Sequence, residues 1–249
     1  MKVVSFSIFK GGTGKTTSTV NTAAALAKSG KKVLLVDLDQ QASATRYLGA
    51  DADTDSLAQV FYGAKSPQSA IITTKFGIDL LPSSPFLAAI EAALEQGDET
   101  RLSAILEPLK PLYDFILVDT PPGKAMLAFN GLAAADIILI PASAERMAVD
   151  GVADLIGYLQ KVMWSKLSLD QELRILFTMF RSTTNHSPAI VENARKIWRE
   201  NVLNVTIPHT TLFSRSYDEQ TPIAFLDPKS NGAMAYAIVA DWLIKEAAK

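Results

Sequence analysis

A glycine-rich segment with two lysines and three threonines is the part of the chain best suited to bind a phosphate group. It directly follows the apolar run 3–9 and comprises Lys10, Gly11, Gly12, Thr13, Gly14, Lys15, Thr16 and Thr17. Glycine lacks a Cβ, so its backbone N–H groups can turn inward around a polyphosphate. A helix that begins near Thr16 directs its positive N-terminal end at the same anion. Lys15 adds a full charge at the β- and γ-phosphates, and the Thr16 hydroxyl is a suitable Mg²⁺ ligand.

Carboxylates follow two further apolar runs of the chain. Asp37 and Asp39 lie at the end of the run 32–37, and Asp119 ends the run 114–119. An aspartate after a buried strand is typical of a residue that holds Mg²⁺, directly or through water. Because Asp37 and Asp39 are two residues apart, one can face the metal while the other faces a water in line with the γ-phosphorus.

These residues need a framework that brings them together, and the sequence predicts an α/β fold. Apolar strand candidates alternate with helical stretches, which indicates a mostly parallel sheet covered by helices on both faces. Right-handed crossovers then place the loops that follow the strands at one edge of the sheet. The expected strands are 2–9, 32–37, 77–82, 114–119, 136–141, 173–180 and 203–207. The expected helices are 16–29, 55–62, 86–110 with a break, 126–134, 146–163, 187–200 and 231–247.

The length and composition fit one large domain that spans residues 1–249. The chain is 48% apolar and 20% charged, which is enough to build a sizeable core. It has no internal repeat, low-complexity segment or linker, and the polar stretch 49–56 reads as a surface loop before a short helix. No helix-turn-helix precedes the phosphate loop, so we expect no separate DNA-recognition domain.

The composition also excludes several classes of site. The chain has no cysteine, which rules out disulfides, thiolate zinc sites and iron–sulfur clusters, and fits a reducing cytoplasm. No run approaches the ~20 apolar residues of a membrane span. Met1 leads almost directly into a strand, so we expect no signal peptide. The net charge of −2 means that any DNA binding needs a local basic patch, which dimerisation would double.

The segment Lys10–Thr17, written KGGTGKTT, resembles the deviant Walker A motif of the ParA/MinD ATPases. The resemblance implies an ATPase that uses ATP and Mg²⁺ and forms an ATP-dependent homodimer. It also implies that Lys10 reaches across the dimer interface to the phosphates of the partner's ATP.

Two switch segments strengthen the resemblance. The family's switch I reads D-x-D-P-Q, which matches 37–41 except that Gln40 replaces the proline. The resemblance gives Asp39 the role of orienting the attacking water. The segment 119–122 matches switch II, and Lys124 departs from the family pattern without a role that we can assign.

The C-terminal half extends the resemblance over nearly the whole chain. The strand 176–180 is similar to the family strand that ends beside the adenine, which implies base contacts by Thr178 and Met179. The segment 206–208 resembles the family's Ile-Pro-Arg element, which implies base contacts by Pro208 and the following His209.

The family divides by the surface on which the ATP dimer sits. MinD-type members end in a basic amphipathic helix, whereas 241–249 holds two lysines and two acidic residues without an apolar tail, so we expect no membrane binding. DNA-binding members use basic residues of the C-terminal half, and phosphate contacts suffice for DNA of any sequence. The candidates here are Arg181, Arg199, Arg215, Lys229 and Lys245.

The resemblance as a whole implies a cytoplasmic protein that associates with the nucleoid when ATP is bound. Slow hydrolysis, stimulated by a ParB-like or cargo-adaptor protein, would release it from DNA and segregate or position a plasmid, a chromosome or a protein cargo. Two alternatives remain. One is a MinD-like surface ATPase, and the other is an ATP-dependent amide ligase or synthetase on the same fold. The ligase would need a second substrate pocket, and the histidines His186 and His209 look unpaired in the sequence.

Overall fold

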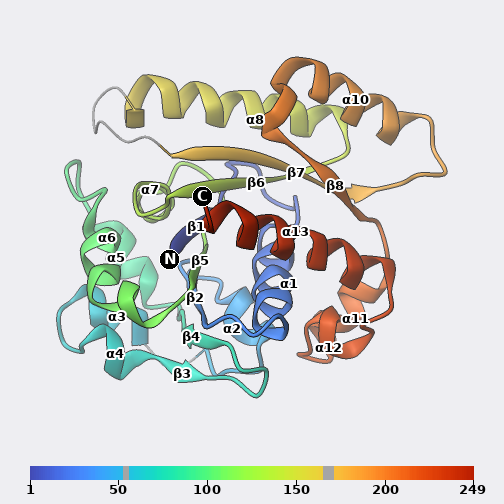
Figure 1. Cartoon of the computed structure of the whole chain (residues 1–249). Coiled ribbons are helices and arrows are strands. Elements are labelled where there is room, and N and C mark those ends of the chain that lie inside the picture. Colours follow the sequence, from blue (N-terminus) through green and yellow to red (C-terminus); the bar gives the residue numbers. More distant parts are fainter. Residues whose placement is uncertain (53–55, 165–170) are drawn as a thin grey trace.

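Within the described residues, eight strands form one sheet in the order β3-β4-β2-β5-β1-β6-β7-β8, and every pair of neighbours is parallel except β3 and β4. The computed structural model describes residues 1–52, 56–164 and 171–249 (Figure 1). The strands are β1 (Lys2–Phe6), β2 (Val33–Asp37), β3 (Ile72–Thr73), β4 (Asp79–Leu81), β5 (Phe115–Asp119), β6 (Ile137–Ser143), β7 (Glu172–Phe180) and β8 (Val202–Pro208).

Helices cover both faces of this sheet. One face is covered by α1 (Lys15–Lys28), α2 (Ser43–Tyr47), α11 (Leu212–Asp218), α12 (Ile223–Leu226) and α13 (Asn231–Ala247). The other is covered by α3 (Ser56–Phe61), α4 (Pro67–Ala70), α5 (Leu87–Ala93), α6 (Arg101–Leu106), α7 (Met126–Ala133), α8 (Arg146–Tyr158) and α10 (His186–Trp198). Shorter turns are η1 (Glu107–Leu112), the π-helical η2 (Leu159–Trp164) and η3 (Arg199–Asn201).

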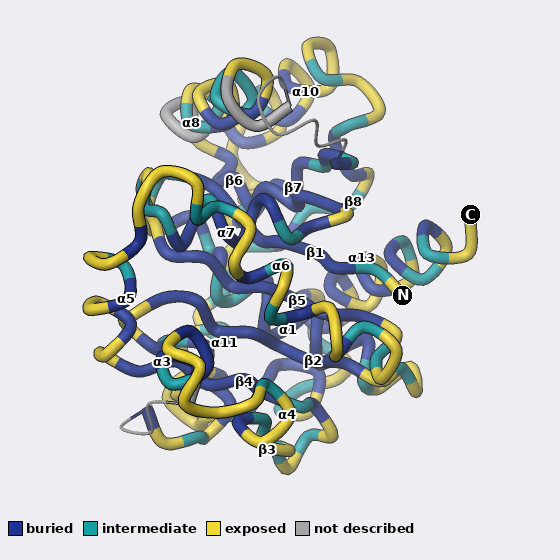
Figure 2. The backbone as a smooth tube through the Cα atoms, turned by 90° about the vertical axis from the view of Figure 1, so that its left-hand side faces the viewer, coloured by how far each residue is buried: buried dark blue, intermediate teal, exposed yellow. Residues whose placement is uncertain are grey.

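The central strands are largely apolar because both of their faces are buried. In β2, Val33 and Leu35 pack in the core beneath α1, whereas Leu34 and Val36 pack in the core on the opposite face. Side chains of a strand alternate between its two faces, so a strand buried on both sides reads as a continuous apolar run. Figure 2 shows these central strands as the buried centre of the molecule, with most exposed residues on the outer helices and loops.

The fold class predicted from the sequence is confirmed, and the differences lie in short elements. The strand β3 was not predicted because its two exposed residues give no alternation pattern. The expected helix 86–110 is divided into α5, α6 and η1, and Gly97 lies between the first two with a φ of 110°. The expected helix 146–163 is α-helical only to Tyr158 and continues as η2. Part of the expected surface loop 49–56 lies outside the described residues.

Four short helices were not predicted at all, namely α2, α4, α11 and α12. Each has seven residues or fewer, which is too short for a clear helical period. In the part of the chain that the structure describes, no helix combines the length and the hydropathy that crossing a membrane requires.

Candidate functional site

The glycine-rich segment Lys10–Thr17 lies between β1 and the start of α1. Gly12 and Gly14 have φ values of 74° and 84°, in the left-handed region that strains residues with a Cβ. Gly14 is the N-cap of α1, and no side chain caps this end of the helix. The first turn of α1 contains no acidic residue. The first N–H groups and the positive end of the helix dipole are therefore directed at a site for an anion.

Hydrogen bonds attach this loop to the rest of the sheet. The Thr178 hydroxyl at the end of β7 donates to the carbonyl oxygen of Thr13 over 2.8 Å. Thr13 is 1% exposed and Lys15 is 8% exposed. The Lys15 charge is thus held within the protein, where it interacts more strongly with a neighbouring anion than it would in water.

Two buried carboxylates lie side by side near the loop. Asp37 and Asp119 are register partners at the ends of β2 and β5, and both are fully buried. Burial raises the pKa of Asp37, and the charge of Asp119 raises it further, although hydrogen bonds from Thr45 oppose this effect. Burial likewise raises the pKa of Asp119, against the opposing effect of the Lys15 charge. A cation between the two carboxylates would remove this cost.

One oxygen atom of this pair, Asp119 Oδ2, fits a bound magnesium ion. Asp119 Oδ1 accepts from the Thr19 hydroxyl over 3.1 Å, but Asp119 Oδ2 accepts no hydrogen bond from any described residue. A buried carboxylate oxygen without a partner is costly, and Mg²⁺ prefers carboxylate and hydroxyl oxygens completed by phosphate and water. The Thr16 hydroxyl also stabilises the charged form of Asp119, which places it near the same site.

The segment after β2 folds around these carboxylates. The Asp39 N–H donates to Asp37 Oδ1 over 3.2 Å, and Asp39 Oδ1 accepts from the Gln41 N–H over 2.9 Å. The Ser83 hydroxyl donates to the Asp39 carbonyl oxygen over 2.6 Å. Asp39 is 8% exposed, so its carboxylate is largely shielded. The segment adopts this shape with Gln40 in place of the proline expected from the resemblance.

Lys10 differs from Lys15 in its surroundings. It is partly exposed at the start of the loop and forms no ion pair with a described residue. A Cβ placed on Gly151 of α8 would lie 3.7 Å from the Cβ of Lys10, so the lysine lies against that helix. Lys10 as a whole is therefore less buried than Lys15.

A cavity of about 450 Å³ lies beside the loop. Its wall contains the four residues that the sequence assigned to base contacts, Thr178, Met179, Pro208 and His209, together with Gly14 and Thr17 of the loop. The structure thus brings these distant segments together. Sequence reasoning missed the part of the wall that α11 supplies. The remaining lining residues are Ile207, Thr210, Phe213, Ser214, Tyr217, Asp218 and Tyr236.

His209 is held at the rim of this cavity by two contacts. The backbone N–H of His209 donates to the Phe180 carbonyl oxygen over 2.9 Å, and the ring Nε2 of His209 lies 3.2 Å from Nη2 of Arg181. A guanidinium group can only donate, so the imidazole Nε2 accepts this hydrogen bond. The histidine that looked unpaired in the sequence is therefore paired with one of the basic residues proposed for DNA contact.

Lys124, for which the sequence gave no role, lies over an aromatic ring. Its ammonium nitrogen is 5.5 Å from the centroid of the Phe9 ring. The neighbouring Gly123 N–H donates to the Phe9 carbonyl oxygen over 2.8 Å. Lys124 thus connects the segment after β5 to the segment after β1 through a cation–π contact with Phe9.

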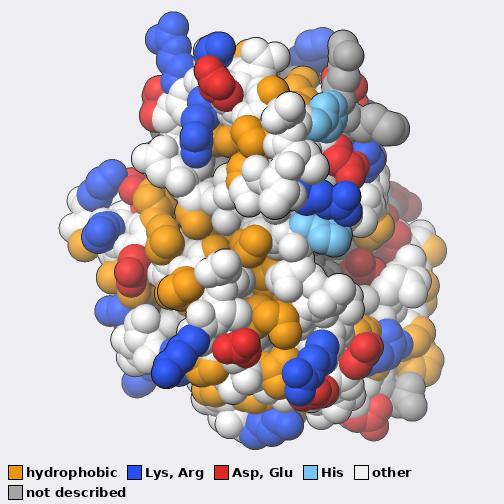
Figure 3. All heavy atoms as spheres, turned by 90° about the vertical axis from the view of Figure 1, so that its right-hand side faces the viewer, with side chains coloured by type: hydrophobic (Ala, Val, Ile, Leu, Met, Phe, Trp, Pro, Cys, Tyr) orange, Lys and Arg blue, Asp and Glu red, His pale blue; other side chains and the backbone are white. Residues whose placement is uncertain are grey.

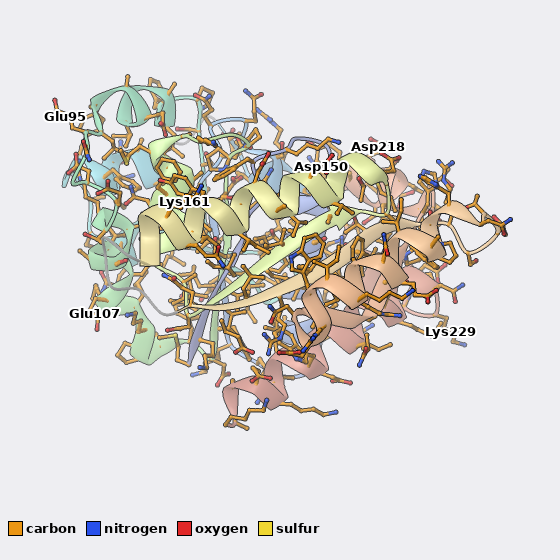
Figure 4. The ribbon with its side chains drawn as sticks, turned by 90° about the horizontal axis from the view of Figure 1, so that it is seen from above. Glu95, Glu107, Asp150, Lys161, Asp218 and Lys229 are labelled. Carbon is orange, nitrogen blue, oxygen red and sulfur yellow. The ribbon has the colours of Figure 1, made fainter. Side chains whose placement is uncertain are left out.

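The five basic residues proposed for DNA contact are all exposed, but they lie on different elements. Arg215 forms an ion pair with Glu219, whose Oε1 is 2.7 Å from its Nε. Figure 3 shows the side of the molecule toward which β6 and β7 point in Figure 1. On this side, the Lys and Arg side chains are separated by acidic, polar and apolar side chains. Figure 4 places Asp218 and Lys229 at one end of the molecule and Glu95 and Glu107 at the other.

Comparisons with known proteins agree with this geometry. Residues 1–175 match a protein-family model described as an AAA domain. The sporulation initiation inhibitor protein Soj of Bacillus subtilis (strain 168) is 35% identical over 248 residues, which cover 96% of each chain. The chromosome partitioning protein ParA of Myxococcus xanthus (strain DK1622) is 34% identical, over 98% of this chain and 88% of that protein.

A solved structure of similar fold is that of cobyrinic acid a,c-diamide synthase from Mycobacterium smegmatis with bound ATP analogue and magnesium. It is 32% identical with a TM-score of 0.85, and the alignment covers 98% of this chain and 95% of the synthase.

Proposed function

We propose that this chain, which belongs to the ParA family of P-loop ATPases within the ParA/MinD group, hydrolyses ATP to control its own dimerisation and DNA binding. Its cofactors are ATP and Mg²⁺. The observation that supports hydrolysis best is the pair of buried carboxylates, Asp37 and Asp119, beside the buried Lys15 and an uncapped helix end.

Each residue of the site has a distinct task in this proposal. Lys15 and the N–H groups of 11–17 bind the β- and γ-phosphates, and Thr16, Asp37 and Asp119 hold Mg²⁺. When bound, Mg²⁺ neutralises charge on the phosphate oxygens. Asp39 orients the attacking water and accepts its proton, which is the role of a general base. The cavity formed by Thr178, Met179, Pro208 and His209 holds the adenine.

The second part of the proposal is an ATP-dependent homodimer. Lys10 is partly exposed, lacks an ion pair with the described residues and belongs to the phosphate loop. It therefore suits a role in trans, in which it neutralises the phosphates bound by the other copy of the chain. A two-fold dimer would give both sites this lysine at once.

The third part concerns the surface and the cargo. The dimer binds DNA without sequence preference through Arg181, Arg199, Arg215, Lys229 and Lys245, and a ParB-like or cargo-adaptor protein stimulates slow hydrolysis. The chain acts in the cytoplasm, as a single domain over 1–249, and associates with the nucleoid when ATP is bound. The result is the segregation or positioning of a plasmid, a chromosome or a protein cargo.

Phosphate release measured together with ATP affinity tests the catalytic core of this proposal. In Asp39→Ala, ATP affinity should stay within about threefold of the wild-type value, while turnover should fall about a hundredfold or more. The two differ because a general base acts mainly in the transition state. An equal loss of affinity and turnover would contradict the role of Asp39. Phosphate release that required an added carboxylic acid and an amide nitrogen donor would instead favour the amide ligase alternative.

A further inference from the structure

The hydroxyl group of Tyr47 connects three helices inside the protein. Tyr47 is the last residue of α2, and its side chain is 1% exposed. Asn21 Nδ2 of α1 donates to Tyr47 Oη over 3.1 Å, and Tyr47 Oη lies 2.7 Å from Ser216 Oγ of α11. Ser216 donates its single hydroxyl hydrogen to the Thr221 carbonyl oxygen over 2.6 Å. Tyr47 must therefore be the donor to Ser216, so the chain of hydrogen bonds has one direction.

Both N–H groups of the Asn21 amide are used at this point, and its oxygen accepts one hydrogen bond. Its Nδ2 also donates to the Thr17 carbonyl oxygen over 2.8 Å, and its Oδ1 accepts from the Ile223 N–H over 2.8 Å. Asn21 and Ser216 are both 0% exposed, so no water replaces a bond that is broken. A displacement of α11 relative to α1 and α2 therefore leaves a buried polar atom without a partner.

The middle residue of α2, Thr45, holds a carboxylate of the proposed magnesium site. The N–H and the hydroxyl of Thr45 both donate to Asp37 Oδ2, over 2.8 Å and 2.7 Å. Thr45 and Tyr47 are two residues apart in a helix of five residues. The position of Asp37 is thus linked through one short helix to the position of Ser216.

Ser216 belongs to the helix that forms one wall of the proposed base cavity. Phe213, Tyr217 and Asp218 of α11 line the cavity, and the ring of Tyr217 packs edge-on against that of Tyr47, with 5.3 Å between centroids. Figure 1 shows α11 with α12 at the right of the molecule, and Figure 4 places Asp218 at that end. The base cavity and the metal carboxylate therefore share α2 as a common support.

We propose that the Tyr47 hydroxyl is a positioning group that couples the base cavity to Asp37, so that the base and Mg²⁺ each strengthen the binding of the other. The inference rests on the proposed function, since it assumes that the cavity takes the base and that Asp37 faces Mg²⁺. Coupling between two sites is reciprocal. It is therefore measurable as the extra gain in affinity that Mg²⁺ gives to a ligand that contains the base.

The experiment compares ATP with inorganic tripolyphosphate, which has the phosphates but no base. Calorimetric titration with and without Mg²⁺ gives an affinity gain for each ligand, and the ratio of the two gains is the base-dependent coupling. In the wild-type protein this ratio should exceed one. Tyr47→Phe keeps the ring but removes the hydroxyl, and should lower the ratio about three- to tenfold, the equivalent of one hydrogen bond.

Two further variants separate coupling from stability. Tyr113→Phe removes another tyrosine hydroxyl, which donates to Asp79 Oδ2 over 2.8 Å at the far side of the sheet, and should leave the ratio unchanged. Ser216→Ala should reproduce the effect of Tyr47→Phe, and the double variant should add nothing to it. A wild-type ratio of one, or an unchanged ratio in Tyr47→Phe, would overturn the coupling. If neither ligand bound the wild-type protein, the proposed function itself would fail.

Discussion

Two lysines in one loop occupy different environments, and this difference separates their tasks. Lys15 is 8% exposed, and its charge opposes the rise that burial causes in the pKa of Asp119, so it acts within its own site. Lys10 lies against α8 near Gly151 and is partly exposed. Removing each lysine should therefore affect different steps.

Lys15→Ala should weaken ATP binding by at least about tenfold, because the variant loses a charge-assisted hydrogen bond to the phosphates. Lys10→Ala should bind ATP with nearly wild-type affinity but should neither dimerise nor hydrolyse it. Fluorescence titration with a labelled nucleotide measures the first property, and phosphate release measures the second. Wild-type turnover in Lys10→Ala would contradict its role in trans.

The carboxylate pair predicts a pH dependence of stability. Burial raises the pKa of Asp37 above its ordinary value of 3.8, and that of Asp119 shifts in the same direction. The folded state thus binds protons more tightly than the unfolded state, so the free energy of unfolding falls as pH rises above the ordinary value. Thermal melting should show this fall in the nucleotide-free protein. Asp37→Asn and added Mg²⁺ with ADP should each flatten the slope, and identical slopes in all three samples would refute the assignment.

At the scale of elements, the long and apolar parts were predictable from the sequence. A run such as 114–119 predicts a buried strand, because a buried parallel strand must be apolar on both faces. The glycine-rich loop between β1 and α1 was predictable for a similar reason, since few other local structures need glycines and lysine at that spacing.

The wall of the base cavity was not predictable in the same way. Helix α11 has seven residues and mixes polar and apolar side chains, so its sequence has no clear period. Its position depends on Tyr47 and Asn21, which lie far away in the sequence. Two sets of hydrogen bonds were not predicted either, because each joins distant segments through a single side chain. One connects Ser83 to Asp39, and the other connects the first N–H groups of α7 to Glu91.

The close packing of α7 behind the segment that follows β5 gives a prediction about stability. A Cβ on Gly131 would lie 2.5 Å from Thr120 Cγ2, so Gly131→Ala should destabilise the protein by about 1–3 kcal/mol. Gly157 in α8 has no heavy atom within 4 Å of such a Cβ, so Gly157→Ala should stabilise it by up to about 1 kcal/mol. Chemical denaturation measures both changes. Equal effects of the two substitutions would show that the contact with Thr120 does not constrain α7.

At the scale of the whole molecule, charge limits how one chain can bind DNA. The net charge is −2, and the basic side chains in Figure 3 do not form one continuous patch. The proposed DNA binding therefore depends on phosphate contacts from two copies of the chain.

Retention of random duplex DNA should consequently require a non-hydrolysable ATP analogue and should weaken steeply with salt. Arg181→Glu, Arg199→Glu or Arg215→Glu at a true contact should abolish retention on unrelated sequences alike. Lys65→Glu makes the same change of charge at an exposed site near α4 and should retain DNA. Absence of retention by the wild-type protein at low salt would rule out DNA as the surface.

The ATP-dependent dimer is the claim on which the DNA surface, the role of Lys10 and the stimulated hydrolysis all depend. Sedimentation velocity of Asp39→Ala with ATP and Mg²⁺ tests it most directly, because this variant should bind ATP without consuming it. We expect a stable dimer with ATP and a monomer with ADP. We also expect a monomer when Lys10→Ala is added to the same chain. A monomer of Asp39→Ala at saturating ATP and high protein concentration would show that ATP does not dimerise this chain.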